Sequence, residues 1–151
     1  MYLGKMHIGT LSLANNIFLA PMAGITDLIF RTLAREFGAS LCFTEMISAN
    51  GLVRKTERSY HYLDSSDHDR PLGVQIFGSD PDILSEAART VAERGADLVD
   101  INMGCPVKKV LKAGSGAFLM KEPEEVSRIL KKVRSAISIP LTIKIRSGWQ
   151  K

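Results

Sequence analysis

Short apolar runs alternate with amphipathic segments along most of the chain. Five runs have the length and the β-branched, aliphatic or aromatic content of buried strands. They are Ile17–Ala20, Leu41–Met46, Leu72–Phe77, Leu98–Met103 and Leu141–Arg146. The segments between them have helical periodicity, so the pattern predicts successive βα units and an α/β fold. Before the first of these strands, Met6–Leu13 predicts a hairpin with Gly9-Thr10 at its centre.

Three predicted helices have clear signals at their ends. Thr26–Asp27 and Ser79–Asp80 are suited to cap the first two, and Gly38 and Gly95 are suited to end them. The third begins with proline and acidic residues, which favour a first helical turn, and then carries an apolar face. The predicted spans, caps included, are 26–37, 79–94 and 122–137.

Periodicity leaves two folds open, an open doubly wound sheet and part of a barrel. Near the end of each of the last three strands, one polar residue stands between apolar neighbours: Gln75, Asn102 and Lys144. Neighbouring residues of a strand point to opposite faces. If the apolar neighbours pack on helices, the polar side chains point into a barrel, at the end where barrel active sites form. The pattern therefore favours a TIM (β/α)8 barrel, of which about five strands are present.

Composition narrows the class of protein only moderately. The 151 residues are 45% hydrophobic and 24% charged, as in an ordinary soluble domain. Twenty Lys and Arg against 16 Asp and Glu give a net charge of +4, which suits a polyanionic partner without establishing one. No run approaches the roughly 18 apolar residues of a membrane span, and the first residues lack a signal-peptide pattern. We therefore expect a cytoplasmic protein that is not embedded in a membrane.

The segment from Asp100 to Pro106 carries the strongest chemical signal. It ends a strand with Asn102 and continues into Gly104-Cys105-Pro106. Most cysteines are small buried apolar residues, but a loop position beside glycine and proline favours a chemical role for Cys105. Cys42 lacks this context and is assigned to the core. The three histidines lack metal-ligand spacing, so no metal site is predicted.

Four segments together resemble the tRNA-dihydrouridine synthases, most closely the bacterial subfamily whose prototype acts on the D-loop. The segments are Leu19–Asp27, Gln75, Asp100–Pro106 and Thr142–Trp149. The resemblance runs from about Ile8 to Trp149. It implies FMN as cofactor, NADPH as electron donor and tRNA as partner. It also implies that residues 1–151 correspond to the N-terminal portion of the catalytic barrel, without the C-terminal half-barrel and the helical tRNA-binding domain.

The resemblance implies five cofactor-binding residues: Pro21, Met22, Ala23, Gln75 and Lys144. The Pro21–Ala23 turn would contact the flavin ring through its backbone, although a plain βα turn would have the same sequence. Gln75 would offer its amide to the ring edge, or bond only to neighbouring backbone. Lys144 would stabilise the anionic reduced ring, or pair with Asp100 inside the barrel.

The resemblance makes Cys105 the proton donor of the reaction. NADPH would reduce FMN, the flavin N5 would pass hydride to uracil C6, and the thiol would protonate C5 from the other side. Asn102 would recognise the base, unless it only caps its strand. Lys108 and Lys109 would contact tRNA, and Arg54, Lys55, Arg58 and Lys112 are further candidates for phosphate contacts, although a solvated face is common. Gly114-Ser115-Gly116 is interpreted as the packed return of the Cys105 loop, and Glu45 receives no derived role.

Three alternatives remain open from the sequence. Another flavin barrel, such as a dihydroorotate dehydrogenase, would also suit a rim cysteine. An aldolase-like barrel would use Lys144 as Schiff-base nucleophile. Finally, the chain alone would be a non-catalytic folding or RNA-contacting fragment, because the phosphate grip of such barrels usually lies after strands seven and eight. We therefore expect the isolated chain to be inactive and to self-associate.

Overall fold

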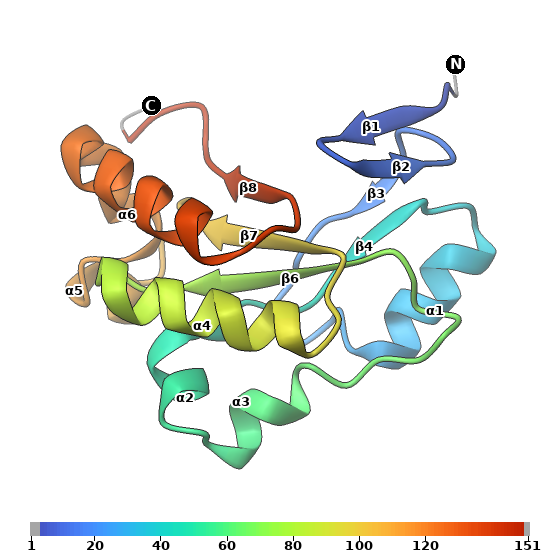
Figure 1. Cartoon of the computed structure of the whole chain (residues 1–151), viewed down its shortest axis with the longest axis horizontal. Helices are drawn as coiled ribbons and strands as arrows, with labels where there is room; N and C mark the ends of the chain where they lie inside the picture. The colour runs from blue at the N-terminus through green and yellow to red at the C-terminus, as the bar shows by residue number, and fades with distance from the viewer. Residues whose placement is uncertain (1–3, 150–151) are drawn as a thin grey trace.

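The computed structural model describes residues 4–149, which form one parallel sheet with helices packed on it (Figure 1). The strands of the sheet are β3 (Phe18–Leu19), β4 (Leu41–Phe43), β5 (Ile47–Ser48), β6 (Leu72–Phe77), β7 (Leu98–Asn102) and β8 (Leu141–Lys144). Their order is β3-β4-β6-β7-β8, and β5 pairs with β6 beyond the end of β4. All five predicted strands are confirmed, most of them shortened at one or both ends.

The three long helices are also confirmed. They are α1 (Leu28–Glu36), α4 (Pro81–Glu93) and α6 (Pro123–Ala136). The Asp27 carboxylate accepts from the Phe30 N–H at 2.8 Å, and the Asp80 carboxylate accepts from two N–H groups of the first turn of α4. Gly38 and Gly95 follow α1 and α4 with φ of 95° and 84°, a conformation that costs glycine little.

Four short elements lie in segments for which the sequence predicted no helix. They are α2 (Ala49–Val53), α3 (Glu57–His61), α5 (Lys108–Lys112) and the 3-10 helix η1 (Gly116–Lys121). The segment after Ser48 is thus a helix, capped by the Ser48 hydroxyl, which accepts from the Gly51 N–H at 3.3 Å. Lys108 and Lys109 lie on α5 and not on a loop. Helices of five residues are too short to produce a readable apolar period.

The two faces of the sheet differ as the barrel interpretation requires. The outer face packs its apolar residues on α4 and α6, which lie side by side on that face (Figure 1). The inner face begins with a small cluster of Leu13, Leu41 and Leu98, to which the β1 (Met6–Ile8) and β2 (Leu11–Leu13) hairpin contributes. The predicted hairpin is confirmed, and its turn at Gly9 lies beside Pro140, just before β8. The chain is therefore an α/β half-barrel with helices outside.

Candidate active site

A layer of polar side chains lies on the inner face above the small apolar cluster. Gln75 of β6, Asp100 of β7 and Asn102 of β7 are 1%, 3% and 7% exposed. The Gln75 Nε2 donates to the Asp100 Oδ2 at 2.6 Å, and the Asn102 Nδ2 donates to the Gln75 Oε1 at 2.9 Å. Thr142 of β8 donates to the Asp100 Oδ1 at 2.6 Å. The inward direction predicted for Gln75 and Asn102 is confirmed.

The loop that carries Cys105 is fixed on both sides of that residue. The Asn102 Oδ1 accepts from the N–H groups of Gly104 at 3.2 Å and Cys105 at 3.0 Å. The Cys105 carbonyl accepts from the Ala117 N–H at 3.0 Å. Gly116 has φ of 63°, and a Cβ there would lie 2.8 Å from the Cys105 oxygen, so glycine allows the close approach. As predicted, residues 114–116 return against the loop.

The two cysteines have different surroundings. Cys105 is partly exposed at the end of the strands where the loops gather. Cys42 is fully buried on the outer side of β4, where its thiol contacts the Arg31 carbonyl at 3.7 Å. Burial raises the pKa of the Cys42 thiol, and neighbouring charges modify this effect. The assignment of Cys42 to the core is confirmed, and Cys105 is the accessible thiol.

The Pro21–Ala23 turn follows β3 at the same end of the sheet. Thr26 holds it, because the Thr26 Oγ1 accepts from the Met22 N–H and donates to the Met22 carbonyl, both at 3.1 Å. Glu45, after β4, accepts from the Gly24 N–H at 2.6 Å. The sequence suggested no role for Glu45, and the structure shows that its carboxylate ties the turn to the next strand.

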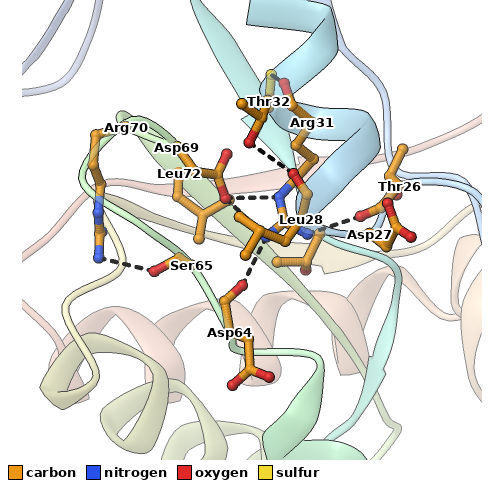
Figure 2. Close-up of polar contacts among 12 residues, drawn as sticks. Thr26, Asp27, Leu28, Arg31, Thr32, Asp64, Ser65, Asp69, Arg70 and Leu72 are labelled. Atoms are coloured by element: carbon orange, nitrogen blue, oxygen red, sulfur yellow. Dashed lines mark hydrogen bonds and ion pairs between the residues drawn. The ribbon is translucent and has the colours of Figure 1, made fainter.

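Figure 2 shows a buried ion pair that also bonds to Thr26, the residue that holds this turn. Arg31 of α1 is 2% exposed and pairs with the fully buried Asp69 at 2.8 Å. Its Nη1 also donates to the Thr26 carbonyl at 2.8 Å, and its Nη2 donates to the Asp64 carbonyl at 2.8 Å. Arg35 adds a second contact to Asp69 at 3.3 Å. Sequence analysis missed this network, because no periodic signal marks a buried arginine.

Lys144 lies on β8 in register with Asn102, and its side chain is exposed. Burial raises the pKa of Asp100, while hydrogen bonds from Gln75 and Thr142 and the charge of Lys144 oppose this rise. Among the described residues, Lys144 forms no ion pair with Asp100.

The basic residues that were predicted to contact phosphate do not form one group. Lys108 and Lys109 are exposed on α5, directly after the Cys105 loop. Lys55 lines a cavity of about 370 Å³ together with residues of α3 and α4. The Arg58 guanidinium donates to the Tyr62 hydroxyl at 3.4 Å. Of these residues, Lys108 and Lys109 directly follow the Cys105 loop of the candidate site.

Two features are absent from residues 4–149. No helix there has the length and hydropathy of a membrane span. No three His, Cys, Asp or Glu side chains there are grouped to hold a metal ion.

The residues present fit the ring end of a flavin. The turn offers backbone groups at Ala23, the Gln75 amide has a second N–H besides the one bonded to Asp100, and Lys144 offers a cation. These groups come from three strand ends of one parallel sheet, so they face a common space.

Solved structures with a similar fold include two amine-oxidising enzymes. Histamine dehydrogenase from Rhizobium sp. 4-9 matches 95% of this chain and 33% of its own, with a TM-score of 0.65 and 12% identity. The 6-hydroxypseudooxynicotine amine oxidase of Pseudomonas geniculata N1 matches 95% and 32%, with a TM-score of 0.70 and 12% identity. At such identity the likeness concerns the fold alone, and it agrees with an incomplete TIM barrel.

The sequence comparisons are more specific. The tRNA-dihydrouridine synthase B of Xanthomonas axonopodis pv. citri is 46% identical over 95% of this chain and 43% of its own. The enzyme of the same name from Escherichia coli K12 is 46% identical over 95% of this chain and 45% of its own. The chain thus spans less than half the length of these relatives. The family model described as dihydrouridine synthase matches residues 18–151, and the chain belongs to the dihydrouridine synthase family.

Proposed function

We propose that this chain is the N-terminal part of the catalytic barrel of a tRNA-dihydrouridine synthase. The whole enzyme would reduce the C5–C6 double bond of uridines in tRNA in the cytoplasm, with FMN as cofactor and NADPH as electron donor. The observation that carries the proposal is the accessible Cys105 on a loop fixed at the strand ends of a chain in this family.

The flavin site is built from three strand ends. The backbone of Pro21–Ala23, held by Thr26 and Glu45, would support the ring edge. Gln75 would donate its second amide N–H, and Lys144 would supply a positive charge. FMN, when bound, would supply hydride to the substrate. The residues of this chain would orient the ring and favour its anionic form.

Cys105 would hold the proton that the pyrimidine accepts at C5. General-acid catalysis requires a protonated group at a fixed position, and the clamped Cys105 backbone provides such a position. Lys108 and Lys109 would contact tRNA phosphates beside the loop. Asn102 would recognise the base, and its amide oxygen also accepts from the Gly104 and Cys105 N–H groups that fix the loop.

Replacing the thiol in a complete enzyme that carries this sequence tests the role of Cys105. We expect Cys105→Ala to bind FMN and to be reduced by NADPH as the wild type is, because neither step needs the thiol. Reduction of tRNA should fall by about 10²–10⁴-fold. Cys42→Ala is the matched control, since Cys42 is buried away from the site. Wild-type turnover on tRNA by Cys105→Ala would contradict the assignment.

A further inference from the structure

We propose that Asp100 is a positioning residue that sets the direction of a buried hydrogen-bond relay and thereby fixes the loop of Cys105. The relay runs from Asp100 through Gln75 and Asn102 to the backbone of Gly104 and Cys105. The importance of this relay for proton donation rests on the function proposed above, whereas its existence and direction do not.

Where the relay meets the Cys105 loop, the side-chain amide of Asn102 can have only one orientation. The N–H groups of Gly104 and Cys105 can only donate, so the Asn102 oxygen must face them. The Asn102 NH₂ then faces Gln75, whose oxygen must accept from it at 2.9 Å. Gln75 is left with its NH₂ directed toward β7, where a hydrogen-bond acceptor is required.

The other end of the relay meets this requirement. The Asp100 Oδ2 lies 2.6 Å from the Gln75 Nε2 and accepts from it. Gln75, Asp100 and Asn102 are all at least nine-tenths buried, so water does not offer them easy alternative partners. An amide turned the wrong way at either position would leave two donors or two acceptors facing each other. The carboxylate therefore selects one orientation for both amides.

The direction of the relay does not depend on the charge of Asp100. Thr142 faces the other oxygen, Oδ1, at 2.6 Å. A proton on Oδ1 would be donated to the Thr142 hydroxyl, which can accept, and Oδ2 would still accept from Gln75. An asparagine at this position has the same two abilities, with its oxygen toward Gln75 and its NH₂ toward Thr142. A leucine has neither.

The relay makes one of the two hydrogen bonds that fix the backbone of Cys105. It holds the Cys105 N–H, while the Ala117 N–H holds the Cys105 carbonyl at 3.0 Å. Loss of the acceptor at residue 100 should therefore loosen the N–H side of the loop without unfolding η1. Hydrogen exchange at the Cys105 amide reports on this loosening directly.

The test compares amide hydrogen exchange, followed by NMR, in Asp100→Leu, Asp100→Asn and Thr142→Val. In Asp100→Leu we expect the Cys105 amide to exchange about tenfold faster, as the loss of one hydrogen bond predicts. Asp100→Asn should keep wild-type protection. Thr142→Val is the matched control, because it removes only the contact to Oδ1. Unchanged protection in Asp100→Leu, or equal loss in Asp100→Asn, would overturn the proposal.

Two further measurements cover the case in which Asp100→Leu does not fold. Gln75→Leu breaks the relay at its middle and should accelerate the same amide. In the wild type, the Cys105 amide must be protected, and the Asn102 NH₂ protons must lie near Gln75 in nuclear Overhauser spectra. Contact of these protons with the Gly104 N–H would show the opposite orientation and overturn the relay.

Exchange measurements separate this proposal from the proposed function, because they involve no tRNA. In a complete enzyme, Asp100→Leu should lower tRNA reduction, and Asp100→Asn should restore it. If the exchange pattern holds but Cys105→Ala reduces tRNA normally, the function falls and the relay stands. If the exchange pattern fails while Cys105→Ala does not reduce tRNA, the relay is wrong and the proposed function stands.

Discussion

Asp100 combines burial with strong hydrogen bonds, and the balance decides how it titrates. Burial is the largest influence and raises its pKa, while Gln75, Thr142 and Lys144 lower it by a smaller amount. A carboxyl whose pKa rises on folding binds its proton more tightly in the folded chain. This tighter proton binding stabilises the folded chain at pH values below the unfolded-state pKa of about 3.9. The stabilisation is lost as the pH rises through the folded-state pKa.

The stability of Asp100→Asn should therefore depend on pH differently from that of the wild type. We expect the variant to gain free energy of unfolding relative to the wild type as the pH rises from about 4 toward neutral, because the wild type alone must bury a charge. Urea unfolding at a series of pH values measures this difference. A difference that stays constant, or that shrinks as the pH rises, would contradict the raised pKa.

The sequence predicted single residues well where strand alternation decides their direction. Gln75 and Asn102 point inward as expected, since each stands between apolar neighbours. Their partners were not predictable, because Gln75 meets Asp100 only through the register of β6 with β7. The contact of Glu45 with Gly24 likewise joins two loops 21 residues apart, and no local pattern encodes it.

At the scale of elements, α1 is attached to the sheet largely by charge. The Arg31–Asp69 pair joins it to the segment before β6, and Arg31 also holds the Thr26 carbonyl under the Pro21–Ala23 turn (Figure 2). Both charges are buried, so each depends on the other for compensation. Removing the Asp69 charge leaves Arg31 as a buried charge without a carboxylate partner.

Asp69→Asn should consequently destabilise the chain by about 3–5 kcal/mol. Urea unfolding at neutral pH measures the effect. Glu125→Gln is a suitable control, because it breaks the Arg128–Glu125 pair, whose arginine is 72% exposed, and should cost less than about 1 kcal/mol. Equal effects of the two substitutions would show that the buried pair contributes no more than a surface pair.

Long elements were predictable and short ones were not. The helices α1, α4 and α6 have 9 to 14 residues, enough for caps and an apolar face to be recognised. By contrast, α2, α3 and α5 have five residues each, and β5 has two. These short elements form because tertiary contacts hold them, such as the packing of α2 on α4.

At the scale of the whole molecule, the barrel was predictable from the polar residues inside the strands, but its surfaces are not those of a closed barrel. The edge strands β3 and β8 each have one neighbour in the sheet. Ile29 on α1 and Phe37 directly after it are 79% and 82% exposed, and on the β8 side Ile145 is 55% exposed. Exposed edges and apolar patches of this kind favour association.

We therefore expect the 151-residue chain to self-associate in solution and to bind FMN weakly. Barrels of this class usually grip phosphate with loops after their seventh and eighth strands, and β8 is only the fifth strand along the barrel path. Light scattering measures the mass, and flavin absorbance near about 450 nm reports retained cofactor.

Substituting lysines on the α1 surface tests whether the exposed apolar side chains there cause the self-association. Ile29→Lys with Phe37→Lys should lower the associated fraction, because both side chains project from the exposed face and neither contributes to the core. Ser127→Lys with Ser135→Lys adds the same two positive charges at exposed positions of α6 and should leave the mass unchanged. A wild-type monomer that carries stoichiometric FMN would show that the half-barrel is sufficient for cofactor binding, and association through open edges and apolar faces would then be wrong.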